Sequence, residues 1–250
     1  MTLAIIGASS EIAQQVARLY STAGHDLLLI GRNMGRLEAF VQDSLAAGVE
    51  VCTCNLDISN LDDCAYAADR VVESLGKDPH VLVAVGSIEN EYSARSCVDD
   101  AVQLVDVNYR NVVALITPIA NALKERRTGC VTIITSVAGD RGRQSNYIYG
   151  SAKSGLSIYA QGLRNYLHRF GVHVLTVKPG YVDTKMLRQV LERDKLSRLR
   201  MVIGNPERVA QNIYSAAMKR KDVLYVPRIW VIVMFVVKNI PEKIFKRLRL

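Results

Sequence analysis

The stretch LAIIGASSEIA, residues 3–13, decides the fold of this chain. Four apolar residues lead into a glycine turn, and a helical pattern starts directly after the turn. Short apolar runs of this kind alternate along the chain with longer stretches of helical period. A helix is also predicted over Pro206–Met218. The predicted strands are Leu3–Ile6, Asp26–Ile30, Glu50–Cys54, Val81–Val85, Val131–Thr135, Val172–Val177 and Val223–Val226.

Strand, helix and strand at this spacing form right-handed crossover units, which build a parallel sheet with helices on both faces. Strands of such a sheet are buried on both sides, which explains why LLLI (residues 27–30) and VLVAV (residues 81–85) are continuous apolar runs. We therefore predict an α/β fold, a single doubly wound domain over residues 1–227, with ligands at the carboxyl ends of its strands. A helical substrate lid is expected at about residues 184–205, and an apolar and basic tail at residues 228–250.

The composition is that of a globular protein. Of 250 residues, 49% are hydrophobic and 22% are charged, which disfavours disordered and collagen-like chains. The five cysteines contain no CxxC pair and the four histidines form no ligand pattern, so we predict neither a disulfide framework nor a metal site. Residues 1–6 lack the basic segment and cleavage site of a secretory signal, and a cytoplasmic protein is expected.

The net charge of +8 would suit a nucleic acid, a phosphorylated substrate or an anionic membrane surface. The basic residues are concentrated late in the chain, where residues 238–250 hold five of them against Glu242 alone. The sequence has no basic groove interleaved with aromatic residues, so nucleic acid is disfavoured as a partner.

The turn after the first predicted strand is a candidate cofactor site. Backbone N–H groups at the start of the following helix are placed to hold a pyrophosphate. Gly7 is the only glycine kept from the usual pattern, because Glu11 and Ala13 stand where glycines are expected. An ordinary strand-to-helix turn therefore stays open as an alternative. The candidate cofactor residues here are Gly7, Ser9, Ser10, Glu11 and Ile12.

The ends of the next two predicted strands bear on the choice of cofactor. A free ribose 2′-hydroxyl favours a carboxylate after the second strand, whereas a 2′-phosphate favours a guanidinium. Arg32 occupies this place and predicts NADPH rather than NADH; the alternative is a solvated arginine that starts the next helix. Asp57, after the third strand, could accept a hydrogen bond from the adenine amino group or be a plain turn residue.

The strongest chemical pattern is Ser136 after a predicted strand, followed by Tyr149 and Lys153 on a predicted helix. A spacing of four residues places Tyr149 and Lys153 on one helix face. An adjacent ammonium stabilises a phenolate and would bring the pKa of Tyr149 down from about 10 toward the working range. Ser136 could bind the same substrate oxygen and hold a carbonyl while its alkoxide is protonated. Tyr147 has no lysine four residues on and is set aside.

This combination resembles the classical short-chain dehydrogenase/reductase family, with its Rossmann-type fold, over nearly the whole chain. The resemblance implies that Asn108, in VDVNYRN, holds a proton-relay water through its backbone. It also implies that Lys153 binds the nicotinamide ribose and Thr184 the cofactor phosphates or carboxamide. VAVG at residues 83–86 replaces the family's Asn-Asn-Ala-Gly and marks a divergent branch. The remaining cofactor residues expected from the resemblance are Gly86, Pro179, Gly180 and Val182.

Two segments resemble one branch of the family. AGDRGRQSNYIYGSAKSGL (residues 138–156) and NIPEKIFKRL (residues 239–248) are similar to reductases that act on a decaprenylphosphoryl-2-keto-pentose, a polyprenyl-phosphate-linked sugar of cell wall polysaccharide precursors. A basic protein with Arg141 and Arg143 could meet such an anionic substrate, although both could be solvated loop charges. Other lipid-like or small ketones (steroid, retinoid, acyl chain) stay open as substrates. A non-catalytic cofactor-binding scaffold is disfavoured, because the catalytic residues are all present.

The tail and one predicted helix are candidates for contact with a membrane or with a second subunit. Residues 229–237 read IWVIVMFVV, nine apolar residues where a membrane-spanning helix needs about twenty. Residues 242–250 then mix apolar and basic residues after Pro241, as interfacial membrane elements do. The tail is expected either to dock peripherally on the inner face of the cytoplasmic membrane or to pack on the sheet or in a subunit interface. The helix with Tyr149, Lys153, Ile158 and Leu163 is a candidate interface of a homodimer or homotetramer, or a buried helix.

Overall fold

The sheet is the centre of the molecule. The computed structural model describes residues 2–194 and 203–248. Seven parallel strands are ordered β3-β2-β1-β4-β5-β6-β7, so the chain moves outward from β1 first to one edge and then to the other. This topology confirms the predicted doubly wound α/β fold. The strands are β1 (Thr2–Ile6), β2 (Asp26–Gly31), β3 (Val51–Asn55), β4 (Pro79–Val83), β5 (Cys130–Ile134), β6 (His173–Pro179) and β7 (Val223–Val226).

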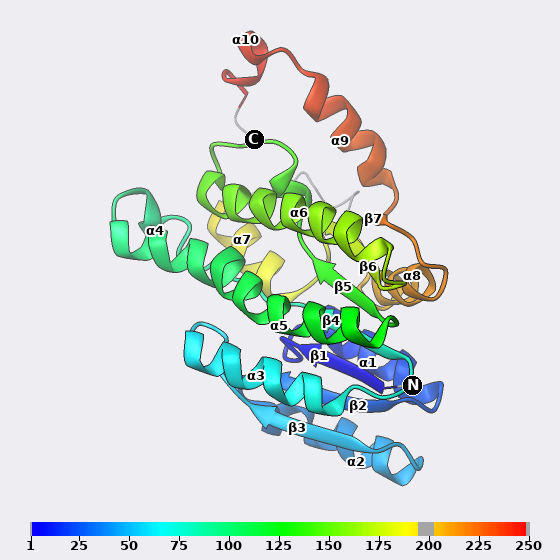
Figure 1. The fold of residues 1–250 in the computed structure, drawn as a ribbon. Helices are drawn as coiled ribbons and strands as arrows, with labels where there is room; N and C mark the ends of the chain where they lie inside the picture. Colours follow the sequence, from blue (N-terminus) through cyan, green and yellow to red (C-terminus); the bar gives the residue numbers. More distant parts are fainter. Residues whose placement is uncertain (1, 195–202, 249–250) are drawn as a thin grey trace.

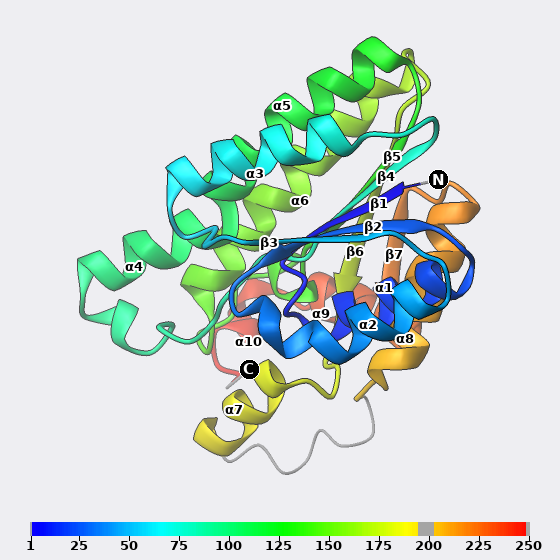
Figure 2. The same cartoon turned by 90° about the horizontal axis from the view of Figure 1, so that it is seen from below.

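Helices cover both faces of the sheet, as Figures 1 and 2 show: α1, α2 and α8 lie on one face and α3, α5 and α6 on the other. The remaining helices, α4, α7, α9 and α10, lie outside these two layers (Figure 2). The helices are α1 (Glu11–Thr22), α2 (Glu38–Ala46), α3 (Leu61–Ser74), α4 (Val98–Val105), α5 (Asn111–Arg126), α6 (Tyr147–His168), α7 (Lys185–Asp194), α8 (Pro206–Met218), α9 (Ile229–Asn239) and α10 (Glu242–Phe245).

Two apolar cores lie above and below the sheet. Because successive side chains of a strand point to opposite faces, Leu3 and Ile5 join the core under α1 and α8, whereas Ala4 and Ile6 join the core under α3 and α5. The continuous apolar strands are thus explained by burial on both sides. The edge strand β3 differs, since Cys52, Thr53 and Asn55 are exposed.

Local sequence accounts for two boundaries that matter for the site. Gly7 has a positive φ of 85°, and a Cβ there would lie 2.6 Å from the Ala84 carbonyl oxygen, so only glycine lets the β1–α1 turn pass so close to β4. Helix α8 begins at Pro206, and the Asn205 side chain accepts hydrogen bonds from the N–H groups of Glu207 and Arg208. The prediction of this helix is confirmed over its full length.

The predicted fourth strand, Val81–Val85, is displaced, because β4 runs from Pro79 to Val83. The apolar run continues beyond the strand, and the Val85 carbonyl there accepts a hydrogen bond from Lys153. The predicted lid, residues 184–205, contains helix α7, and its residues 195–202 lie outside the described residues.

The tail folds into α9 and α10, which are separated at Pro241 as predicted, and lies at the β7 edge of the molecule, far from β3 (Figure 1). Trp230 and Met234 are buried against Val137, Tyr181 and Tyr225. The other face of α9 is exposed. Among the described residues, no helix has the length and apolar character needed to cross a membrane.

Candidate active site

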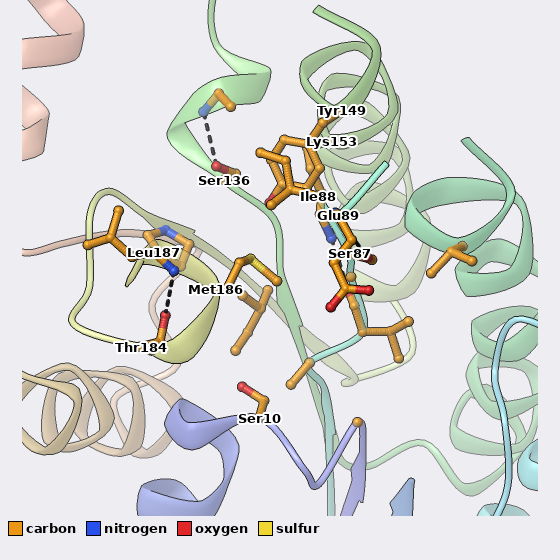
Figure 3. A pocket seen from close by; sticks show the side chains of 18 of the residues that line it. Ser10, Ser87, Ile88, Glu89, Ser136, Tyr149, Lys153, Thr184, Met186 and Leu187 are labelled. Carbon is orange, nitrogen blue, oxygen red and sulfur yellow. Dashed lines mark hydrogen bonds between the residues drawn. The ribbon is translucent and has the colours of Figure 1, made fainter. Parts of the chain in front are cut away.

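A cavity of about 600 Å³ lies at the carboxyl ends of the strands, within the usual size range of ligand sites. Figure 3 shows its walls: Ser10 at the start of α1, Thr184 to Leu187 on one side, Ser87 to Glu89 on the other, and Ser136, Tyr149 and Lys153 together. Every sequence-predicted site residue lines this cavity except Asn108.

Ser136 and Tyr149 come from two elements that meet at this cavity. Ser136 directly follows β5, and its Oγ accepts a hydrogen bond of 3.1 Å from the backbone N–H of Ala138. Tyr149 lies in the first turn of α6 and hydrogen-bonds the Ser136 side chain. The two hydroxyl groups can therefore bind one substrate oxygen together.

Lys153 lies one helical turn after Tyr149, and its Nζ is 5.8 Å from the centre of the Tyr149 ring. The side chain is almost fully buried, and Nζ donates a 2.9 Å hydrogen bond to the Val85 carbonyl. A Cβ on Gly86 would lie 2.9 Å from this Nζ, so a larger residue there would displace the lysine. The backbone of the loop after β4 thus fixes the ammonium beside the phenol.

The pKa values of this pair depart from the sequence expectation. The pKa of Tyr149 is raised to about 12, chiefly by burial; the Ser136 hydrogen bond opposes this rise, and the negative charge of Glu91 adds to it. Burial also lowers the pKa of Lys153 to about 7. The expected lowering of the Tyr149 pKa by Lys153 was wrong for the protein without ligands, because desolvation of the phenolate is the larger effect. Tyr149 holds its proton at neutral pH, as a proton donor must.

Asn108 is fully buried and lies behind the cavity wall. It belongs to a π-helical turn, Asp106–Arg110, between α4 and α5. Its Nδ2 donates to the carbonyls of Ser87 (2.7 Å) and Leu104 (2.8 Å), and its Oδ1 accepts from the Ser87 N–H (3.1 Å). The side chain therefore braces the loop that holds Lys153.

Glu91 is a residue that sequence reasoning missed. Its side chain has no exposed surface, and its carboxylate accepts hydrogen bonds from the backbone N–H groups of Ile148 (3.2 Å) and Tyr149 (2.8 Å). The carboxylate caps the start of α6, where a helix favours negative charge. The two partners lie 57 and 58 residues away in sequence, so no local pattern could have indicated the contact.

The start of α1 suits a bound phosphate group. Ser10 is the N-cap, and its side chain makes no capping hydrogen bond, which leaves the first N–H groups of the helix for a ligand. The Glu11 carboxylate, which stands in place of a glycine, instead accepts the Lys185 N–H of α7 at 2.9 Å and lies 4.0 Å from the Arg188 guanidinium. Glu11 thus joins α7 to the turn after β1.

Arg32 and Asp57 line the cavity after β2 and β3, away from Ser136, Tyr149 and Lys153. The Arg32 side chain is 64% exposed, and its one ion pair within residues 2–194 and 203–248 is a long one with Asp57, at 3.9 Å. Its guanidinium is free to meet an anionic group at the end of β2. The Asp57 carboxylate also accepts a hydrogen bond from the Ser59 N–H. This is the contact of a turn aspartate, which is one of the two roles that the sequence left open.

The segment after β6 carries the remaining predicted cofactor residues. Pro179 ends β6, and the Gly180 N–H donates to the Val226 carbonyl. Val182 pairs with Gly204, and the Thr184 Oγ1 donates to the Val182 carbonyl. These contacts hold the segment against the cavity ahead of α7.

The loop between Ser136 and Tyr149 is tied to the tail and to the sheet. The Asp140 carboxylate pairs with Lys178 of β6 and accepts a hydrogen bond from the Tyr225 hydroxyl. Arg141 donates to the carbonyls of Val237 and Lys238, pairs with Glu242 and stacks on Phe245. The sequence-based suggestion that Arg141 meets the substrate was therefore wrong, because its guanidinium is fully engaged by the tail.

The comparisons with known proteins agree with this geometry. The family model for short chain dehydrogenases matches residues 1–195. An uncharacterised oxidoreductase of Mycobacterium tuberculosis is 31% identical over 98% of this chain and 95% of its own length. One of Streptomyces coelicolor is 30% identical over 99% of this chain and 95% of its own length.

Solved structures share the fold. A short-chain dehydrogenase from Sphingobium yanoikuyae in complex with NADPH aligns with a TM-score of 0.81, 22% identity and 96% coverage of both chains. A variant of the actinorhodin polyketide ketoreductase with NADPH aligns with a TM-score of 0.77 and 23% identity, over 90% of this chain and 95% of that one. The chain therefore belongs to the short-chain dehydrogenase family, whose members are oxidoreductases.

Proposed function

We propose that this protein is an NADPH-dependent reductase that converts a ketone to an alcohol. The observation that carries the proposal is that Ser136, Tyr149 and Lys153 meet at one wall of a cavity that is also lined by Arg32, an exposed arginine after β2. Two structures of the same fold are described as complexes with NADPH, which supports this cofactor. The uncapped N-terminus of α1 and the exposed Arg32 guanidinium fit a pyrophosphate and a 2′-phosphate.

Bound NADPH would supply the hydride that reduces the carbonyl carbon. Ser136 and Tyr149 donate hydrogen bonds to the carbonyl oxygen and hold it in one orientation. As negative charge develops on this oxygen, Tyr149 transfers its phenolic proton and Ser136 stabilises the remaining charge. Lys153 lies beside the phenol and can stabilise the phenolate that is left, while Asn108 keeps the loop at Lys153 in place.

The proposed substrate is a 2-keto-pentose that is linked to a polyprenyl phosphate. Support comes from the resemblance of residues 138–156 and 239–248 to reductases of such substrates and from the chemistry of the cavity wall. Met186, Leu187 and Val190 of α7 give one side of the cavity an apolar character suited to a lipid chain. Other ketones, such as steroids, retinoids or acyl chains, remain the second candidate class, since these same apolar residues would suit them.

The proposal includes association with a membrane surface and with further copies of this chain. Peripheral contact with the inner face of an anionic membrane is supported by the exposed side chains of Ile232, Phe235 and Ile244 beside basic residues of the tail. A homodimer or homotetramer through α6 is supported by Ile158, an apolar side chain of this helix that is 63% exposed. A strictly monomeric mass in solution at micromolar concentration would contradict the oligomer.

The decisive experiment is a turnover assay. Purified protein is mixed with NADPH and a panel of ketones that includes a polyprenyl-phosphate-linked keto-pentose, a steroid and a small ketone, and oxidation of NADPH is followed by absorbance. We expect turnover, with the lipid-linked sugar preferred. Tight binding of NADPH without turnover of any ketone would favour a cofactor-binding scaffold instead. If the steroid is the preferred substrate, the proposed reductase activity stands and the polyprenyl-phosphate-linked keto-pentose is rejected as the substrate.

A further inference from the structure

Two buried polar atoms in the cavity wall have no hydrogen-bond partner within the described part of the chain. Only three buried side-chain nitrogen or oxygen atoms there lack a hydrogen-bond partner: Asn111 Oδ1, Arg143 Nε and Asn146 Oδ1. Buried polar groups are nearly always paired, so each exception calls for an explanation. Arg143 and Asn146 both line the cavity and lie on the same short loop between Ser136 and Tyr149, whereas Asn111 lies outside it.

The Arg143 guanidinium has no anionic partner within the described residues. Its one recorded hydrogen bond runs from Nη2 to the Met234 sulfur at 3.3 Å, which is a weak acceptor. The nearby Asp140 carboxylate is already taken by Lys178 and the Tyr225 hydroxyl. Partial burial lowers the pKa of Arg143, which means that its charge is poorly solvated where it stands. A charge in this position gains most from an anion that enters the cavity.

Hydrogen bonds on both sides of Arg143 tie its loop to neighbouring elements. Arg141 and Gln144, on either side of Arg143, bond to the tail at Lys238 and Leu248. The Ser145 carbonyl accepts a 2.6 Å hydrogen bond from Arg95. A loop that is tied in this way loses less conformational freedom when a ligand binds.

We propose that Arg143 and Asn146 form a subsite for an anionic, hydroxylated part of the ketone substrate, with the guanidinium binding phosphate or carboxylate oxygens and Asn146 Oδ1 accepting a hydroxyl proton. This inference rests on the proposed reductase function and narrows its substrate class. Arg143 here is a specificity-determining residue and takes no part in hydride or proton transfer. A neutral steroid or retinoid would leave both groups unpaired, and such a site rejects ligands that lack the matching groups.

Two pairs of ketones test the subsite, each pair sharing a carbonyl and differing in charge. D-Ribulose 5-phosphate is compared with D-ribulose, and levulinate with 2-pentanone, at saturating NADPH so that the cofactor phosphate site is filled. We expect kcat/KM to favour the anionic member of at least one pair by about tenfold to a hundredfold, the value of a charge-assisted hydrogen bond. The preferred pair shows whether phosphate or carboxylate is the ligand.

The Arg143→Gln variant should lose this preference, because kcat/KM should fall more on the anionic member of the pair than on the neutral one, while Arg143→Lys should restore part of it. Arg208→Gln, an equal change of charge on the exposed surface of α8, is the control and should keep the preference. An equal loss on both members of a pair would mean that Arg143 only supports the loop, and would overturn the inference. Equal rates of the wild-type protein on both members of each pair would overturn it as well.

Binding to the protein–NADP⁺ complex separates this inference from the proposed function. Titration calorimetry with D-ribulose 5-phosphate and with levulinate needs no turnover. Binding that requires Arg143 but leads to no reduction would support the subsite and count against the reductase. Reduction of neutral ketones without any Arg143-dependent binding of an anion would support the reductase and reject the subsite.

Discussion

Two tyrosines at the start of α6 differ in every property that matters for proton transfer. Tyr149 is buried, hydrogen-bonded to Ser136 and lines the cavity, whereas Tyr147 is 47% exposed. Removing the Tyr149 hydroxyl deletes the transferable proton and leaves the cofactor end untouched. Tyr149→Phe should therefore lower kcat by about a hundredfold to ten-thousandfold with little change in the dissociation constant of NADPH. Tyr147→Phe is the matched control, and a near-normal kcat for Tyr149→Phe would reject the assignment.

The burial of Lys153 predicts how the free energy of unfolding depends on pH. Its pKa is about 7 in the folded protein and near its ordinary value of 10.5 in the unfolded chain. Between these two pH values the unfolded chain binds more protons, so the free energy of unfolding should rise with pH. Urea unfolding at pH 7 and pH 9 should show this rise in the parent protein and a smaller rise in Lys153→Met. Identical pH dependence in the two proteins would mean that the folded state holds Lys153 protonated.

Arg32 makes a prediction about cofactor choice. Its guanidinium is exposed and makes a long, solvated ion pair with Asp57, at 3.9 Å, so it can still take a 2′-phosphate as a partner. Arg32→Asp should shift the preference from NADPH toward NADH, because it removes the phosphate partner and adds an acceptor for the ribose hydroxyl. Dissociation constants for both cofactors, measured on the parent and the variant, check this. Equal affinities in the parent would identify Arg32 as a surface charge.

At the scale of the element, helix α6 depends on a carboxylate from a distant loop. Glu91 caps its first N–H groups, so Glu91→Gln should lose one of two hydrogen bonds and cost about 1–3 kcal/mol of stability. The same change removes the charge that helps raise the Tyr149 pKa, and the alkaline limit of activity should move to lower pH. Glu125→Gln, on the exposed surface of α5 and away from the cavity, is the control. Unchanged stability and pH profile would reduce Glu91 to a packing residue.

Elements with a strong local signal were predictable, and contacts between distant elements were not. The apolar runs predicted the strands, and the helical pattern over Pro206–Met218 predicted α8, because these signals act within a few residues. The pairing of Tyr149 with Lys153 is also local. Glu91 and the engagement of Arg141 by the tail depend on side chains that meet only in three dimensions. The pKa of Tyr149 was misjudged for the same reason, since burial cannot be read from the spacing of two residues.

At the scale of the whole molecule, one face of the tail packs on the domain and the opposite face is exposed. The Trp230 ring occupies the space beside Gly180, and Met234 contacts Arg143 in the cavity wall. The opposite face presents Ile232 and Phe235, which are 62% and 71% exposed. Truncating the tail at Pro227 would therefore uncover core residues near Ser136, and point changes on the exposed face are the sharper probe of what this face binds.

The double variant Ile232→Glu with Phe235→Glu tests membrane docking without touching the packed face. The intact protein should sediment with phosphatidylglycerol vesicles and less so at high salt, because each basic residue near an anionic surface adds about 1 kcal/mol. The double variant should remain in solution, fold normally and keep its activity on a water-soluble ketone, since neither residue lines the cavity. If the intact protein ignores vesicles and the double variant instead halves its mass in solution, the exposed face joins two copies of this chain. The lipid-linked substrate would then lose its main physical support, while the reductase chemistry of Ser136, Tyr149 and Lys153 would be unaffected.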